Sequence, residues 1–178
     1  LTAMTRLDHN RSRTAFAKKA GVSNSDVTQL TIWGYHSNTQ FPDFSNAKIN
    51  GKPAEQTITD HKWLEETFVS TIQTRGAAVI KARGMSSAMS AANGAIDHVK
   101  SMIRGTPAND WVSMAVVSQG EYGVPKDMVF GYPCTTDGKG NYKVVDGLKF
   151  DAFGQAKFQT TLQELLEEKD AVKDLIPS

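Results

Sequence analysis

The chain has 178 residues, of which 39% are hydrophobic and 22% are charged. Its 20 lysines and arginines are nearly balanced by 19 aspartates and glutamates, so it lacks the basic excess that a nucleic-acid-binding protein uses to hold a phosphate backbone. No apolar run approaches the roughly 20 residues that a membrane span needs. Cys134 is the single cysteine, which excludes an internal disulfide and a cysteine-built metal site and favours a reducing, cytoplasmic compartment.

The N-terminal part is expected to form a helix followed by a strand. Helix-compatible residues fill positions 5–20, and Gly21 is a natural C-terminal stop. Residues 27–33 contain β-branched and aromatic side chains and predict a strand. Gly34 ends that strand, so Tyr35-His36-Ser37 is placed in the loop just beyond its carboxyl end.

The middle of the chain predicts a hairpin and two long helices. Asn50-Gly51 is a strong hairpin signal within the strand-and-turn material of residues 41–58. One helix is predicted from about residue 60 to residue 84 and another over residues 86–103. The second helix carries an apolar stripe that is predicted to face the core, formed by Met89, Ala92, Ile96, Val99 and Ile103. Its other face carries the small residues Ala88, Ala91 and Ala95, so two buried faces are expected.

The C-terminal part is expected to be β-rich and to end in a helix. Strands are predicted over residues 111–118, 128–133 and 142–145, with glycine-rich turns between them. An apolar pattern of helical period predicts a final helix over residues 151–175. The fold class predicted for the chain is therefore α+β, an antiparallel or mixed sheet with long helices.

Three residues are candidates for chemistry. His36 follows a strand and a glycine, a position from which side chains are often presented to a cleft. Asp8 and Arg11 are three residues apart and lie on neighbouring ridges of the first predicted helix. In a structural interpretation, Asp8 completes a capping box with Thr5 and pairs with Arg11. In a functional interpretation, the carboxylate orients an imidazole while the guanidinium grips a substrate carboxylate. The residues alone leave both interpretations open.

Five stretches in a fixed order add a further signal. They are MTRLDHNRS at residues 4–12, WGYHSNTQ at 33–40, RGAAVIKAR at 75–83 with SSAMSAA at 86–92, GEYGVP at 120–125 and LLEEK at 165–169. Together they resemble the malate dehydrogenases of the lactate/malate dehydrogenase superfamily, and the cytosolic-type branch fits best. The resemblance covers essentially the whole chain. Tyr35 departs from the pattern, because relatives usually have asparagine before the histidine.

The resemblance implies that residues 1–178 form the C-terminal domain of such an enzyme, which binds substrate and carries out catalysis. A nucleotide-binding domain is expected to precede it, because no Gly-x-Gly-x-x-Gly fingerprint follows a strand in this sequence. The implied reaction is the reversible, NAD-dependent oxidation of malate to oxaloacetate. NAD is expected to be bound mainly by the other domain, so no cofactor-binding residue and no metal ligand is assigned in this chain.

The resemblance also assigns roles residue by residue. His36 is implied to be the general acid/base, Asp8 the partner that orients it, and Arg11 the clamp on the substrate carboxylate. Ser87 and Gly76 match positions that line the substrate pocket in relatives.

Two other functions are weighed against malate dehydrogenase. A lactate dehydrogenase, or an enzyme for another 2-hydroxy acid, keeps the same fold and mechanism, because the residue that separates these substrates in the superfamily lies in the other domain. A non-catalytic oligomerisation or binding domain needs none of the three candidate residues. The expected partners are a small dicarboxylate substrate and a second copy of the chain in a homodimer, because surplus apolar surface is expected on the helices.

Overall fold

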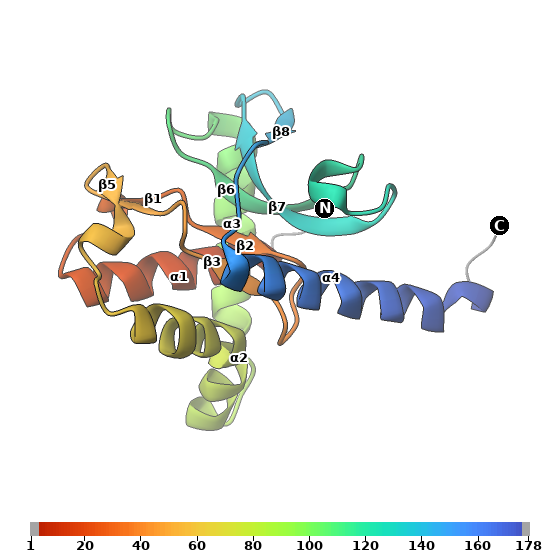
Figure 1. Ribbon diagram of the computed structural model, residues 1–178, viewed down its shortest axis with the longest axis horizontal. Helices are drawn as coiled ribbons and strands as arrows, with labels where there is room; N and C mark the ends of the chain where they lie inside the picture. Colours follow the sequence, from red (N-terminus) through yellow and green to blue (C-terminus); the bar gives the residue numbers. More distant parts are fainter. Residues whose placement is uncertain (1–3, 176–178) are drawn as a thin grey trace.

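The computed structural model describes residues 4–175, in which four long helices surround three small antiparallel sheets (Figure 1). The helices are α1 (Met4–Ala20), α2 (Val69–Arg83), α3 (Ala88–Arg104) and α4 (Ala152–Ala171). A π-helical segment, Trp63–Phe68, leads directly into α2. Short 3₁₀ turns lie at Asn24–Asp26, Ala54–Gln56, Glu121–Gly123 and Lys173–Leu175.

The three sheets are built from short strands. β6 (Val112–Val117), β7 (Val129–Thr136) and β8 (Tyr142–Val144) form the largest sheet. β2 (Thr31–Trp33) pairs with β3 (Phe41–Asp43), and β1 (Val27–Thr28), β4 (Lys48–Ile49) and β5 (Lys52–Pro53) form the third sheet. A bridge from Gly34 to Gly131 joins the end of β2 to β7. The predicted α+β class, with antiparallel pairing and long helices, is confirmed.

The hairpin predicted at Asn50-Gly51 is also confirmed. β4 and β5 pair on either side of these two residues. Asn50 has a φ of 52° and Gly51 a φ of 77°, the pair of positive angles that a type I′ turn requires.

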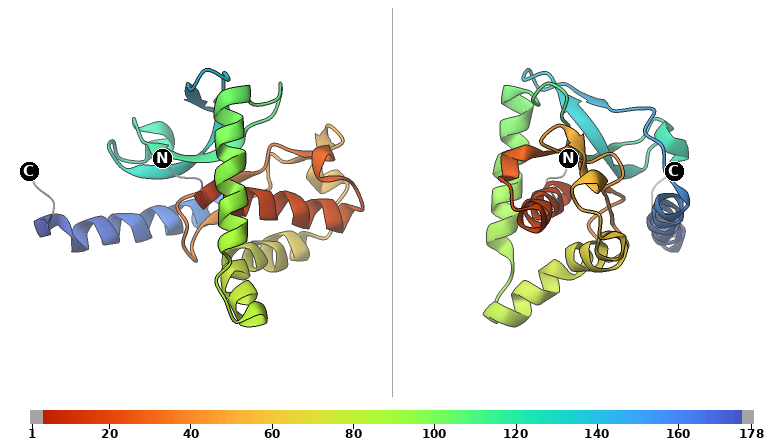
Figure 2. Two further views of the ribbon diagram at one scale, coloured as in Figure 1. Left: turned by 180° about the vertical axis from the view of Figure 1, so that it is seen from behind. Right: turned by 60° about the vertical axis from the view of Figure 1, so that its left-hand side comes forward.

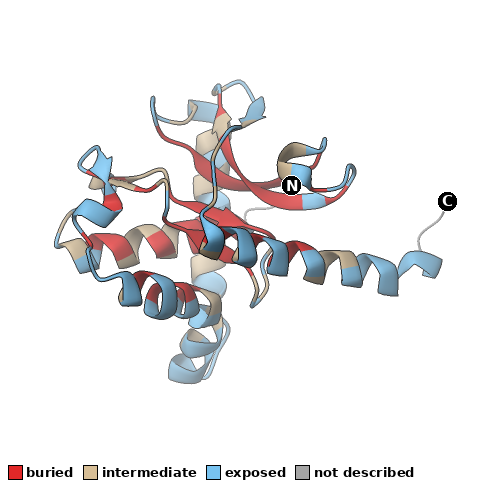
Figure 3. Cartoon of the chain, viewed as in Figure 1, coloured by how far each residue is buried: buried red, intermediate tan, exposed pale blue. Residues whose placement is uncertain are grey.

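The core is divided between two hydrophobic clusters. One packs Phe16 of α1 against Leu64, Phe68 and the short β1 and β4 strands. The other packs β6, β7 and α4 around Trp33, which has no exposed surface. Figure 3 shows the buried residues concentrated on β2, β3, β6, β7 and one side of α1. The loop that follows Trp33 therefore starts from a fully buried, closely packed residue.

One predicted strand is wrong in its extent. Residues 27–33 form two strands, β1 and β2, instead of one. The chain turns at Gln29, whose φ is 60°, and its backbone N–H donates to Asp110 Oδ1 at 2.8 Å. This contact with a residue far along the chain moves β1 and β2 into different sheets.

The predicted core face of the helix at residues 86–103 is also wrong. Met89 is 72% exposed, and Ile96, Val99 and Ile103 are more than half exposed. The expectation of two buried faces is wrong as well, because Ala88 and Ala95 are exposed and Ala91 is only partly buried. Within α3 the buried residue is Gly94. A Cβ at Gly94 would lie 3.0–3.1 Å from Leu7, so only glycine lets α3 cross α1 this closely. Figure 2 shows α3 crossing α1 on the outside of the molecule, which leaves the apolar stripe on its outer face.

Within residues 4–175, none of the helices has both the length and the apolar character that crossing a bilayer demands.

Candidate active site

The structure brings Asp8, Arg11 and His36 into contact. His36 Nδ1 lies 2.7 Å from Asp8 Oδ2, and Arg11 Nη1 donates to Asp8 Oδ1 at 2.8 Å. Asp8 has no exposed surface, whereas the His36 side chain is 39% exposed. An ionised carboxylate only accepts hydrogen bonds, so His36 Nδ1–H donates to it, and the other ring nitrogen, Nε2, is left free to exchange a proton at the surface.

Asp8 combines one contact from each interpretation of the Asp8–Arg11 spacing, the pairing with Arg11 and the contact with an imidazole. Asp8 pairs with Arg11 on its own helix, and its second oxygen holds the imidazole. The predicted capping box is not formed: Asp8 lies inside α1 with its carboxylate committed to these two partners, and Thr5 Oγ1 is buried without a hydrogen bond.

A buried hydrogen-bond network fixes the helix that carries Asp8. His9, the next residue, is 1% exposed, and its Nδ1 lies 3.1 Å from Ser113 Oγ on β6. The same hydroxyl accepts the backbone N–H of Ile32 on β2 at 2.8 Å. Burial lowers the pKa of His9 well below its usual range, and the cations of Arg6 and Arg13 lower it further. His9 is thus a neutral structural link between α1 and the strand that leads to His36.

Hydrogen bonds also tie α1 to α3. Arg6 Nη1 donates to Ser101 Oγ at 2.8 Å, and Asn10 Nδ2 donates to Asp97 Oδ2 at 2.7 Å. These contacts and the close approach at Gly94 hold α1 between α3 and β6, so the position of Asp8 is set from both sides.

The loop that carries His36 is held on its other side by α4. Tyr35 Oη donates to Glu168 Oε1 at 2.8 Å, and Ser37 Oγ donates to Glu164 Oε2 at 2.9 Å. Thr39 Oγ1 donates to the same oxygen of Glu164. Tyr35 departs from the family pattern, and neither glutamate was predicted from the sequence as a site residue. Their separation of four residues on one helix is the only local signal that they could act together.

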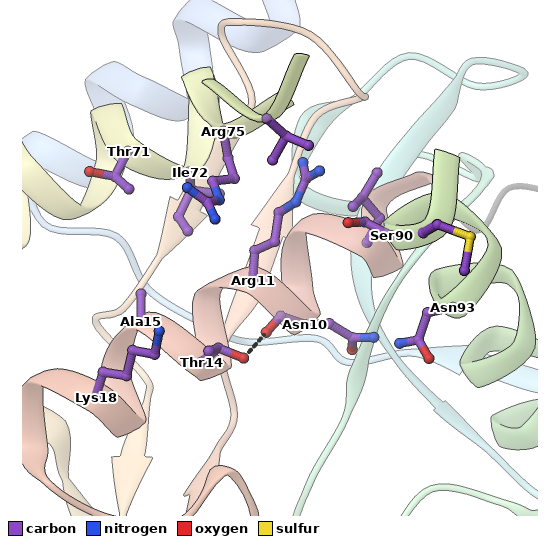
Figure 4. Close-up of a pocket in the computed structure, with 13 residues that line it drawn as sticks. Asn10, Arg11, Thr14, Ala15, Lys18, Thr71, Ile72, Arg75, Ser90 and Asn93 are labelled. Atoms are coloured by element: carbon purple, nitrogen blue, oxygen red, sulfur yellow. Dashed lines mark hydrogen bonds between the residues drawn. The ribbon is translucent and has the colours of Figure 1, made fainter. Parts of the chain in front are cut away.

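A cavity of about 600 Å³ opens beside Arg11, between α1, α2 and α3 (Figure 4). Arg11 and Lys18 line it from α1, and Arg75 lines it from α2. Its walls hold three cationic side chains and no carboxylate, so it favours an anion. Arg11 Nη2 is buried and has no hydrogen-bond partner among residues 4–175. His36 and Asp8 do not line the cavity, and Arg11 is the residue that connects it to them.

Comparison with known proteins gives this arrangement a context. The model of the lactate/malate dehydrogenase α/β C-terminal domain family matches residues 5–176. The chain belongs to this family. Malate dehydrogenase from Naegleria fowleri is 41% identical, with a TM-score of 0.90 over 97% of this chain. A lactate dehydrogenase from Trichomonas vaginalis, solved with NADH and oxamate, is 32% identical, with a TM-score of 0.87 over 94% of this chain.

The chain spans about half the length of these relatives, since it covers 52% of each. More distant members keep the same fold: malate dehydrogenase from Salinibacter ruber is 24% identical, with a TM-score of 0.77. Malate and lactate dehydrogenases both occur among the similar structures, so membership of the family leaves the substrate open.

The two other family positions lie near the cavity. Gly76 is in α2 next to Arg75, with open space where a Cβ would stand. Ser87 is partly buried and precedes α3, two residues before Met89 of the cavity wall. Neither makes a hydrogen bond to Asp8, Arg11 or His36 within residues 4–175.

Cys134 is unsuited to nucleophilic chemistry. It lies on β7 in the hydrophobic cluster around Trp33 and has no exposed surface, and burial raises the pKa of its thiol to about 12. The reactive thiolate is therefore scarce near neutral pH.

Proposed function

We propose that this chain is the substrate-binding and catalytic half of an NAD-dependent malate dehydrogenase, which interconverts malate and oxaloacetate. The observation that carries the proposal is the contact of His36 with a fully buried Asp8 that also holds Arg11. Free-standing binding domains need no such arrangement. NAD supplies the hydride acceptor when it is bound, and we propose that a preceding nucleotide-binding domain holds most of it.

In this proposal, His36 moves the substrate proton. Its Nε2 accepts the hydroxyl proton during malate oxidation and returns it during oxaloacetate reduction, a task for which imidazole is suited because both of its forms are accessible near neutral pH. Asp8 fixes the tautomer through Nδ1 and stabilises the imidazolium, and it does not itself take up the proton. The His36 side chain is 39% exposed, which leaves it accessible to substrate.

Arg11 binds the substrate carboxylate. Its Nη1 is already held by Asp8, which orients the guanidinium, and its buried, unpartnered Nη2 is available to an anion. The cationic cavity next to it supports an acidic substrate. Gly76 and Ser87 are proposed to border the same site.

The alternative is a lactate dehydrogenase, which is supported by the 32% identity to the Trichomonas vaginalis enzyme. The greater identity to the Naegleria fowleri malate dehydrogenase favours malate. The test is NADH oxidation by the complete enzyme with oxaloacetate or pyruvate as the alternative substrate. If the protein is a malate dehydrogenase, its kcat/KM for oxaloacetate is much larger than its kcat/KM for pyruvate. The reverse order identifies a lactate dehydrogenase, and inactivity with both overturns the proposal.

We also propose that the enzyme is cytoplasmic, of the cytosolic-type branch, and a homodimer. The exposed apolar stripe on α3 supports a partner, because more than half of the surface of Met89, Ile96, Val99 and Ile103 faces outward. The other explanation is that the nucleotide-binding half covers the stripe within one chain.

A further inference from the structure

The loop of residues 34–40 connects β2 to β3 and lies between two helices, α1 and α4. The His36 side chain points toward α1, where its Nδ1 contacts Asp8. The alternate residues Tyr35, Ser37 and Thr39 all contact α4 instead. Figure 1 shows α4 running alongside this part of the chain. The loop is therefore held on the side opposite to the one that presents the imidazole.

Two carboxylates of α4 make these contacts. Glu168 accepts the Tyr35 hydroxyl at 2.8 Å. One oxygen of Glu164 accepts both the Ser37 hydroxyl, at 2.9 Å, and the Thr39 hydroxyl. Burial and the neighbouring Glu168 raise the pKa of Tyr35, so its phenol stays protonated and remains a donor near neutral pH. Hydrogen bonds to charged acceptors are stronger than those between neutral groups.

Both ends of the loop are also fixed. The Gly34 carbonyl accepts the backbone N–H of Gly131 on β7, and Gly34 packs against Thr161 of α4. At the other end, Gln73 Nε2 on α2 donates to the Gln40 carbonyl at 2.8 Å. Between these ends, the two glutamates bind the side chains on either side of His36.

We propose that Glu164 and Glu168 are positioning residues that hold the His36 loop at the correct distance from Asp8. The inference rests on the proposed function, because it names what places the proposed acid/base. The His36 side chain is partly exposed, and in the part of the chain that the structure describes its one hydrogen bond is the 2.7 Å contact to Asp8. Its own side-chain contacts therefore restrain it weakly. A displacement of about 1 Å in a reacting group can lower a rate by about 10²-fold.

The first test compares alanine with glutamine at each glutamate in the complete enzyme. A glutamine oxygen still accepts the same hydroxyl groups, whereas alanine removes the acceptor. We expect Glu164→Ala to lower kcat by about 10- to 100-fold, with the KM for substrate and the Kd for NADH unchanged, and Glu164→Gln to restore most of the loss. Glu167→Gln, on the same helix but bonded to Gln163 instead of the loop, is the control and should keep full activity.

Tyr35 allows a second, independent test. Tyr35→Phe and Glu168→Ala remove the two halves of one hydrogen bond, so the double variant should lose no more kcat than the worse single variant. Additive losses would show that the two residues act separately and would overturn this part of the proposal. Equal damage from Glu164→Ala and Glu164→Gln would show that charge matters and hydrogen bonding does not, which also overturns it.

A structural readout separates this proposal from the proposed function. The ¹⁵N resonances of the His36 ring, assigned by their absence in His36→Asn, report the Nδ1 hydrogen bond to Asp8 directly. We expect Glu164→Ala and Glu168→Ala to move the Nδ1 resonance and Glu167→Gln to leave it in place, whether or not the enzyme reduces oxaloacetate. If the alanine variants lower only the melting temperature, with kcat and the Nδ1 resonance unchanged, the glutamates support the fold and do not position His36.

Discussion

Replacing Gly34 with alanine should both destabilise the protein and displace His36. Gly34 has a φ of 95°, which costs an L-residue about 1–2 kcal/mol. The new Cβ would lie 2.9 Å from Thr161 Cγ2 and closer still to Oγ1. Thr161 is fully buried in α4 and cannot swing away, so overpacking adds about 1–3 kcal/mol. The free energy of unfolding should therefore fall by about 2–5 kcal/mol.

Gly51 offers a matched control. Its φ is 77°, but nothing lies within 4 Å of an added Cβ. Gly51→Ala should therefore lose only the conformational part, about 1–2 kcal/mol. Thr161→Ala, combined with Gly34→Ala, removes the two closest atoms but leaves Thr161 Cβ at 3.0 Å, so it should recover part of the overpacking cost of about 1–3 kcal/mol relative to the sum of the single variants.

The assay is equilibrium urea unfolding of the same purified protein, with all four variants and the parent measured together. Turnover should fall further in Gly34→Ala than in Gly51→Ala, because Gly34 begins the loop that carries His36. Equal losses of stability at the two glycines, or no recovery in the double variant, would refute the conclusion that α4 presses on this loop.

Four further predictions concern the site and its surroundings. His36→Asn in the complete enzyme should lower kcat by about 10²- to 10⁴-fold while NADH titration shows unchanged binding; near-normal oxaloacetate reduction would remove His36 from the mechanism. Arg11→Lys keeps the charge but loses the planar two-pronged donor, so steady-state kinetics should show a higher KM and a kcat/KM lower by about tenfold or more. Burial holds the pKa of His9 below its unfolded value of about 6.5, so the unfolded state binds a proton that the folded state does not. The stability that is present above about pH 6.5 is therefore lost as the pH falls. Urea titrations at several pH values should show that the free energy of unfolding falls less steeply with decreasing pH in His9→Asn than in the parent. Sedimentation of the complete enzyme at micromolar concentration should show a homodimer, and a fully active monomer would assign the α3 stripe to contacts within one chain.

Much of the local structure follows from the sequence alone. Helix-compatible residues and the stop at Gly21 predicted α1, helical periodicity predicted the other three long helices, and Asn50-Gly51 predicted the hairpin. Neighbouring residues settle these features through backbone preferences. The sequence also singled out Asp8, Arg11 and His36, through their residue types and through the family resemblance, although 28 positions separate Asp8 from His36.

Tertiary structure decided the features that depend on residues far apart in the chain. The strand breaks at Gln29 because its N–H is taken by Asp110, 81 positions away. The apolar stripe of α3 faces outward because Gly94 allows close contact with α1 only on the opposite side of the helix. Periodicity shows that one face of a helix is apolar but does not show which part of the protein packs against that face. Glu164 and Glu168 hold the His36 loop across separations of 125 to 133 residues. Such contacts arise only when packing has already brought α4 against the loop, so the four-residue spacing of the glutamates could not reveal their partners.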